Sequence, residues 1–149
     1  YVLNCRKVLG QDVPEYDHIK AIWLAMVASY GLEAIRFMVS FATSLGMVEN
    51  KIFVGNGNII SLILQDELLH TDWSAWIMNT LVHDDPRFRQ VRDDCMQESM
   101  AILQNVIDEE KNWADYLFQK VVDIGLHANI MKSFVDWTAH ARLKQIGMD

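Results

Sequence analysis

The chain has 149 residues, of which 51% are hydrophobic and 22% are charged, and its formal net charge is −7. This length and composition predict a single domain over residues 1–149 that can bury a core without disulfide bridges. The acidic balance and the scattered Lys and Arg residues exclude a nucleic-acid surface, which requires clustered positive charge.

The sequence also disfavours two further classes of protein, those stabilised by disulfide bridges and those that span a membrane. The two cysteines, Cys5 and Cys95, form no C-x-x-C pattern, so we expect a reduced, cytoplasmic setting. We expect no membrane span, because charged residues interrupt every apolar run before it reaches about 18–20 residues. The sequence opens on YVLNCRKVLG without an initiator Met, and we expect it to be a fragment or a processed chain.

Helical periodicity begins after Pro14. From Asp17 to about Gly46, apolar residues recur at helical spacing and predict one long helix. The glycines and asparagines of GNGN, residues 55–58, predict a break, with Asn58 as a possible N-cap. A second helix is expected from Ile59 to about Val82.

The C-terminal half shows clearer boundaries. HDDPRF, residues 83–88, predicts a turn with Asp85 as the cap and Pro86 at the first helical position, followed by a helix to about Val122. DIGLHAN, residues 123–129, ends that helix, and a last one is expected from about Ile130 to Ile146, before Gly147. Strand-type alternation is not apparent, so the fold class is all-α, with the outline of a helical bundle.

QDELLH, residues 65–70, places ionisable residues inside a long apolar stretch. Glu67 and His70 are three residues apart, so on a helix both side chains can reach one point. Bundle proteins with di-metal carboxylate sites use this E-x-x-H spacing, although the bare pattern also occurs by chance. The apolar surroundings predict a central helix, where a buried carboxylate needs a partner, and a divalent metal is one such partner.

Glu33 repeats this feature in the preceding helix, within YGLEAIRFMVSFATSLG. A second carboxylate on a neighbouring antiparallel helix would complete half of a two-metal site. The alternative is an ion pair with Arg36, three residues later, which the sequence supports equally.

EYDH, residues 15–18, has the same spacing but cannot serve the same site. On one continuous helix Glu15 lies about 27 Å from Glu33 at about 1.5 Å per residue, whereas the metals of a two-metal site are about 3.5–4 Å apart. We interpret Glu15 as a first-turn acid favoured by the helix dipole, and His18 as a surface residue. The remaining histidines are predicted to be solvated, namely His83, His127 and His140.

Several segments, taken together, resemble a known family in order and spacing. They are LEAIRFMVSFATS (32–44), GNGNIISLILQDELLH (55–70), EEKNWADYLF (109–118) and TAHARLKQIGMD (138–149). They closely resemble the C-terminal half of the helical core of the class I ribonucleotide reductase small subunit, from about Lys20 to Asp149. The resemblance implies a ferritin-like helical bundle, incomplete here, with about four long helices of the family's core.

Members of this family are the small subunits of an oxidoreductase. The small subunit assembles a di-iron centre, or a manganese-containing one in some members. With oxygen, this centre makes a radical that the large subunit uses to reduce ribonucleotides to deoxyribonucleotides. The resemblance implies that Glu33, Glu67 and His70 bind one metal ion, and that Asp66 hydrogen-bonds a ligand histidine and joins the radical-transfer route. The residues that match the pocket around the metal and the radical are Phe37, Ser40, Phe41 and Ile63.

Two departures from the family shape the functional hypotheses. Gln65 stands where the family usually has Arg, which alters the charge balance along the transfer route. The family's other metal ligands and its radical Tyr belong to an N-terminal half, and its large-subunit docking tail follows the position of Asp149. We therefore expect a separate N-terminal half, a homodimeric assembly and a large-subunit partner.

Two other hypotheses stay open at this point. One is a cofactor-free helical module that retains only dimer or large-subunit binding. The other is a different di-metal oxidase of the same fold, against which the match through NWADYLF argues.

Overall fold

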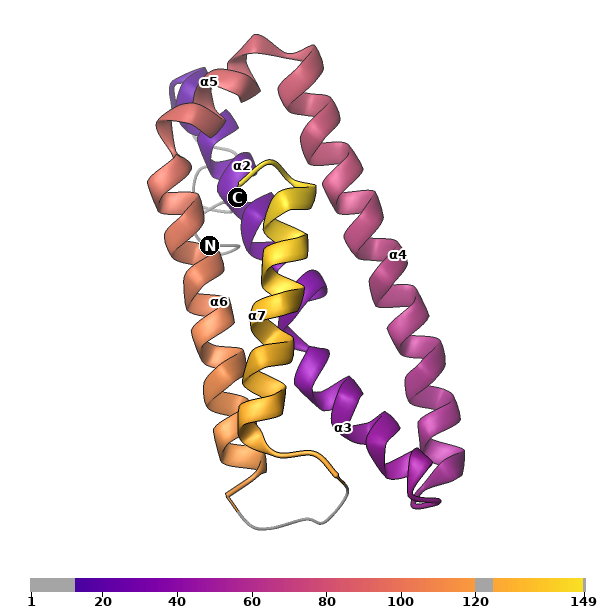
Figure 1. Cartoon of the computed structure of the whole chain (residues 1–149). Helices are drawn as coiled ribbons and strands as arrows, with labels where there is room; N and C mark the ends of the chain where they lie inside the picture. The colour runs from indigo at the N-terminus through magenta and orange to yellow at the C-terminus, as the bar shows by residue number, and fades with distance from the viewer. Residues whose placement is uncertain (1–12, 120–124, 149) are drawn as a thin grey trace.

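The molecule is a bundle of long helices, identified here from a computed structural model that describes residues 13–119 and 125–148. In chain order the elements are α2 (Glu15–Gly31), the π-helix η1 (Leu32–Arg36), α3 (Met38–Glu49), α4 (Val54–Asp84), α5 (Pro86–Asp94), α6 (Met96–Leu117) and α7 (Ala128–Gln145). Figure 1 shows α6 and α7 side by side, with α2 and α3 running past them and the long α4 along the opposite edge. None of the described residues forms a strand, and the predicted all-α, ferritin-like bundle is confirmed.

The core lies between α2, η1, α3, α6 and α7, and α4 and α5 add Ala75, Met78 and Val91 to it. Trp23 and Tyr30 on α2 are buried, and each hydrogen-bonds a distant helix. The Trp23 indole donates to the Ser99 hydroxyl at 3.1 Å, and the Tyr30 hydroxyl donates to the Arg142 carbonyl at 2.9 Å. Helix α2 therefore lies at the centre of the core, and α6 and α7 pack against it.

The prediction that residues 59–69 belong to a buried central helix is wrong for this chain. The 31 residues of α4 include only four buried ones, Gly57, Thr71, Ala75 and Met78. Ile59, Leu62 and Leu69 are each about 60% exposed. The segment is apolar, as its sequence shows. However, α4 packs only one narrow face against α3, η1, α5 and α2, and the rest of its residues lie at the surface.

The helical segment Glu15–Glu49 is long and apolar enough, by length and composition alone, to cross a membrane. Of the 18 consecutive residues that form the most apolar part of this segment, half are buried inside the bundle. Core helices of soluble proteins meet the same criterion, so this segment is weak evidence for a membrane span.

The helix expected from Asp17 to Gly46 is interrupted rather than continuous. Its middle turn, η1, is π-helical, and Phe37 then separates η1 from α3 with φ −97° and ψ −2°. A π-turn has one extra residue per hydrogen-bonded ring and so changes the direction of the side chains that follow. Periodicity alone could not reveal this, because apolar spacing on both sides of the turn remains helical.

The break predicted at GNGN is also wrong, because these residues lie inside α4. The Gly57 amide donates to the Phe53 carbonyl at 3.0 Å, which is a helical bond, and Asn58 is therefore not an N-cap. The turn falls earlier, where the Asn50 side chain donates to the Gly46 carbonyl at 2.9 Å. Lys51 and Phe53 adopt left-handed backbone conformations there, with φ 59° and 52°.

Gly57 is needed for packing instead of for a turn. A Cβ at this position would lie 1.9 Å from Cγ2 of Val48, whereas a Cβ at Gly55 would meet nothing within 4 Å. Glycine therefore allows α4 to approach α3 closely at Gly57.

Other local boundaries agree with the sequence. Asp85 is the N-cap of α5, accepting from the Arg87 amide at 2.9 Å, and Pro86 is the first helical residue. Gly147 adopts φ 67° just after α7 ends, as the predicted stop requires. The single helix expected from Pro86 to about Val122 is wrong in two respects: Cys95, with φ −102° and ψ 14°, divides it into α5 and α6, and α6 already ends at Leu117.

Substituting Gly57 with Ala should destabilise the chain by roughly 1–3 kcal/mol, because the new methyl group forces Val48 and α3 to shift. The matched control is Gly55→Ala, which should be neutral or stabilising by up to about 1 kcal/mol, since Ala has the higher helix propensity. Urea unfolding of both variants measures the difference. Equal free energies of unfolding for the two variants would contradict the packing role.

Candidate metal centre

Glu33, Glu67 and His70 converge between η1 and α4. The His70 Nδ1 atom lies 3.1 Å from Glu33 Oε2 and 3.4 Å from Glu67 Oε2. All three donor atoms lie within 4.8 Å of one another. The side chains are 33% (Glu33), 19% (Glu67) and 56% (His70) exposed, so the group faces solvent on one side.

The backbone brings these three side chains together from two elements. Glu67 and His70 are separated by about one turn of α4, so they point in nearly the same direction. The buried Thr71 anchors that turn by donating its hydroxyl to the Glu67 carbonyl at 2.8 Å. Glu33 lies in the first turn of η1, the element that packs against α4.

The alternative pairing of Glu33 with Arg36 is not what the structure contains. The Arg36 guanidinium instead forms an ion pair with Glu109 on α6. Glu33 is thereby left to interact with the two α4 residues, and its carboxylate has no Lys or Arg counter-ion in the described part of the chain.

The electrostatics of the group raise the pKa values of two of its members. A hydrogen bond with Glu33, together with burial and the Glu33 charge, raises the pKa of Glu67, and His70 partly opposes this effect. Hydrogen bonds to Glu67 and Glu33 raise the pKa of His70. Two carboxylates placed side by side repel each other unless a proton or a cation lies between them.

The donor set suits a divalent transition metal. Donor atoms around one ion, each at about 2.0–2.2 Å, are separated by roughly 3–4 Å, so small side-chain rotations would close this group around an ion. One imidazole nitrogen with carboxylate oxygens is a ligand combination that iron, manganese and zinc accept. The exposed side leaves room for further ligands.

The other residues predicted for the pocket around the metal have different surroundings in the structure. Phe37 and Phe41 are in ring contact, with centroids 6.1 Å apart, and Phe41 is buried. The Ser40 hydroxyl accepts from the Trp113 indole at 2.9 Å. Ile63, one turn before Glu67 on α4, is 40% exposed.

Asp66 is exposed on α4 beside Glu67. Among the described residues, the bonds of the His70 ring go to Glu33 and Glu67 and not to Asp66. A histidine partner for Asp66 would have to come from elsewhere.

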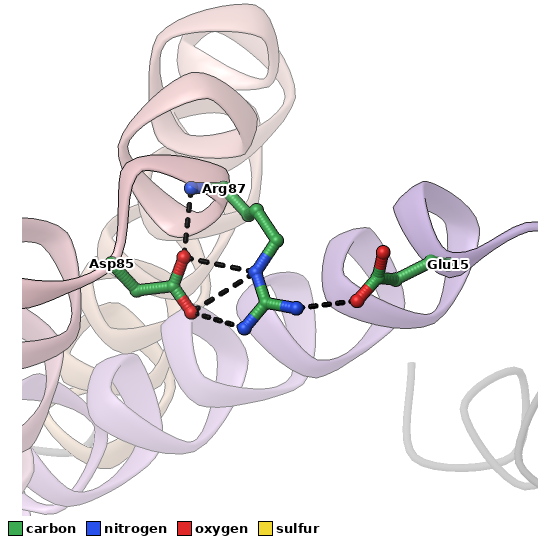
Figure 2. A network of polar contacts seen from close by, with 3 residues as sticks. All are labelled: Glu15, Asp85 and Arg87. Atoms are coloured by element: carbon green, nitrogen blue, oxygen red, sulfur yellow. Dashed lines mark hydrogen bonds and ion pairs between the residues drawn. The ribbon is translucent and has the colours of Figure 1, made fainter.

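Glu15 stands apart from this group, as expected. Figure 2 shows the Arg87 guanidinium between the carboxylates of Asp85 and Glu15, so that Glu15 ties the start of α2 to the start of α5. His18 is partly buried on α2 instead of being a surface residue. The predicted solvent exposure of the remaining histidines is confirmed for His83, His127 and His140.

Sequence reasoning missed Glu110. It is 2% exposed on α6, and its carboxylate accepts from the Val39 amide at 2.8 Å. A signal was present, because Glu110 continues the helical spacing of the buried residues Leu103, Ile107 and Ala114. A charged residue at a core position of an amphipathic helix calls for a specific partner.

Comparison with known proteins identifies the family. Residues 9–149 match the family described as "Ribonucleotide reductase, small chain". The chain is 36% identical over 132 residues to ribonucleoside-diphosphate reductase 1 subunit beta of Escherichia coli O157:H7, which covers 87% of this chain and 35% of that protein. It is 37% identical over 151 residues to the subunit beta of Buchnera aphidicola subsp. Baizongia pistaciae, covering 99% of this chain and 39% of that protein.

A third relative, ribonucleoside-diphosphate reductase subunit beta of Enterobacteria phage T4, is 36% identical over 135 residues, which are 89% of this chain and 35% of that protein. The chain thus spans little more than a third of the length of these relatives. With the match over nearly its whole length, this chain belongs to the ribonucleotide reductase small-chain family.

Proposed function

We propose that this chain contributes Glu33, Glu67 and His70 as ligands to one ion of a di-iron or manganese–iron centre in a ribonucleotide reductase small subunit. The observation that carries the proposal is the convergence of these three donor atoms within 4.8 Å, from two separate elements. When bound, such a centre supplies with oxygen the oxidising power to generate a radical. The large subunit would use that radical to reduce ribonucleotides to deoxyribonucleotides.

Each residue of the group has a defined task in this proposal. The carboxylates of Glu33 and Glu67 supply negative charge, and the His70 Nδ1 atom supplies a neutral nitrogen donor. Arg36 is held away by Glu109, which keeps a positive side chain from competing with the ion for Glu33. Burial of Glu67 to 19% exposure limits water at the inner side of the group.

The neighbouring residues are proposed to shape the surroundings. Phe37, Phe41 and Ile63 would exclude water from the metal and the radical, and Ser40, which lines the same pocket as Phe37, would lie near the cofactor. Asp66 would hydrogen-bond a ligand histidine from outside this sequence and carry the radical-transfer route. Its exposed position next to Glu67 leaves it accessible to such a partner.

We further propose that the ligands of the second ion come from an N-terminal half of the small subunit that lies outside this sequence. Three protein ligands suffice for one ion but not for two. The exposed apolar residues of α4 support the idea, because such a surface is suited to packing against further helices. The assembly is proposed to be homodimeric, to bind the large subunit and to act in the cytoplasm.

Metal titration tests the ligand assignment. The full chain should bind one Co²⁺ ion, and Glu67→Ala or His70→Ala should weaken the affinity by about 100-fold or more. The expected loss of affinity is larger than the roughly 10–100-fold loss that follows removal of a residue that only hydrogen-bonds a metal ligand. His140→Ala and Glu49→Ala, both exposed on other helices, are the matched controls. An affinity that is unchanged in the two site variants, or lost equally in the controls, refutes the assignment.

Reconstitution tests the need for a second half. Iron titration followed by visible absorbance should give no more than one iron and no tyrosyl radical for the chain alone, but two irons and a radical after the N-terminal half is added. Two irons and a radical from the chain alone would overturn this part of the proposal. If Glu67→Ala leaves deoxyribonucleotide synthesis unchanged in the complete complex, the chain is a cofactor-free interaction module.

The pH dependence of the metal-free chain provides an independent check. Because the folded-state pKa values of Glu67 and His70 are raised, these two groups bind more protons in the folded chain than in the unfolded chain. Their stabilisation is complete below the ordinary values, 4.5 for Glu67 and 6.5 for His70, and is lost as the pH rises through the folded values.

Between about pH 5 and about pH 8 in EDTA, the Tm of the wild type should therefore fall relative to that of Glu67→Gln, which cannot ionise at this position. Saturating Co²⁺ should reduce or reverse the fall, since metal binding requires deprotonated ligands. Parallel Tm profiles for the two proteins without metal would contradict the raised pKa of Glu67.

A further inference from the structure

Glu110 is a buried acid that the metal ligands do not explain. It lies on α6 with 2% exposure, and its Oε1 atom accepts a hydrogen bond from the Val39 amide at 2.8 Å. Burial raises its pKa to about 7, while the Val39 amide and the Arg36 charge act in the opposite direction. Burying a carboxyl group costs free energy unless it has a specific partner, and the Val39 amide is that partner here.

Val39 is the second residue of α3, directly after the π-helical interruption. The first amides of a helix have no acceptor within the helix and are usually satisfied by the side chain of the N-cap residue. Here the N-cap is Phe37, whose side chain has no acceptor, and the first helical bond of α3 is that from the Phe41 amide to the Phe37 carbonyl, at 3.0 Å. Glu110 supplies from a different helix the acceptor that Phe37 lacks.

The same face of α6 contacts the junction at two further points. Glu109 pairs with Arg36, the last residue of η1, and the Trp113 indole donates to Ser40 of α3 at 2.9 Å. Of the three contacts only the Glu110 bond is made to the backbone and is buried. It is therefore the contact that fixes the position of the main chain rather than that of a side chain.

The position of Glu33 depends on that main chain. Within residues 13–119 and 125–148, the Glu33 carboxylate bonds only to the other members of the ligand group, so no outside side chain orients it. Its direction is set by η1, which is bounded on one side by Gly31. A Cβ at Gly31 would lie 3.1 Å from Leu103 on α6. The α6 helix thus contacts the chain closely before η1 and anchors it after η1.

We propose that Glu110 is a positioning residue for the Glu33 ligand, because its carboxylate caps the Val39 amide and thereby holds the junction of η1 and α3 in register with α4. This inference rests on the proposed function, in which Glu33 binds a metal ion. Glu110 itself does not touch the metal ligands. Its effect on the ion is transmitted through the backbone from Val39 to Glu33.

The test compares Glu110→Ala with Glu110→Gln in the full chain. Gln keeps an acceptor of the same length and is a close substitute for the neutral form of Glu110, whereas Ala removes the acceptor and leaves the Val39 amide unpaired. Asp108→Ala is the matched control, since Asp108 is exposed on the same helix and, among the residues that the structure describes, its hydrogen bond is to its neighbour Gln104.

Two measurements are made on each variant. In the metal-free chain, amide hydrogen exchange at Val39 should be faster in Glu110→Ala and close to wild type in Glu110→Gln. With Co²⁺ as the probe, the affinity of Glu110→Ala should fall by roughly 10–100-fold. The visible absorption of its bound Co²⁺ should change, because Glu33 is displaced, and Glu110→Gln should restore both.

The outcomes separate the two proposals. If the wild type binds no Co²⁺, the proposed function fails, and exchange at Val39 alone decides whether Glu110 holds the junction. If the wild type binds Co²⁺ and Glu110→Ala binds it with the same affinity and spectrum, the positioning role is refuted while the ligand assignment stands. Should Glu110→Ala fail to fold, an altered Co²⁺ spectrum in folded Glu110→Gln with normal Val39 exchange also refutes the role.

Discussion

The packing of α3 and η1 against α4 is the constraint on which the candidate site depends. Glu33 reaches Glu67 and His70 only because the two helical runs lie side by side in a fixed register. Two features at the far end of α3 help to set that register, the tight turn with left-handed Lys51 and Phe53, and the close approach at Gly57. The ligand group is thus a product of helix packing, and its precision depends on contacts distant from the donors.

Features determined by neighbours in the sequence could be predicted, and features determined by distant partners could not. The E-x-x-H spacing places Glu67 and His70 together on any helix, and the Asp85–Pro86 cap is equally local. The GNGN interpretation failed because glycine serves turns and close packing alike, and only the contact with Val48 decides between them. The apolar residues of α4 predicted burial, but burial depends on which other helices are present, which composition cannot specify.

The π-turn, and the partner that Glu110 finds at Val39, could not be predicted for the same reason. Val39 and Glu110 are 71 residues apart, and nothing near Val39 indicates that its amide is capped from another helix. Two acids of this chain, Glu110 and Glu33, illustrate different uses of charge. Glu110 is buried and holds a backbone amide, whereas Glu33 is partly exposed and free of any Lys or Arg partner in the described residues, which suits it to a cation.

The central claim is that one metal ion lies between η1 and α4. It is tested most directly by a crystal structure of the full chain soaked with Co²⁺ or Fe²⁺, with anomalous scattering recorded at the metal edge. The account predicts one peak at about 2.0–2.3 Å from the carboxylates of Glu33 and Glu67 and from the His70 Nδ1 atom. Metal bound only at other histidines such as His83 or His127, with no peak between these three side chains, would contradict it.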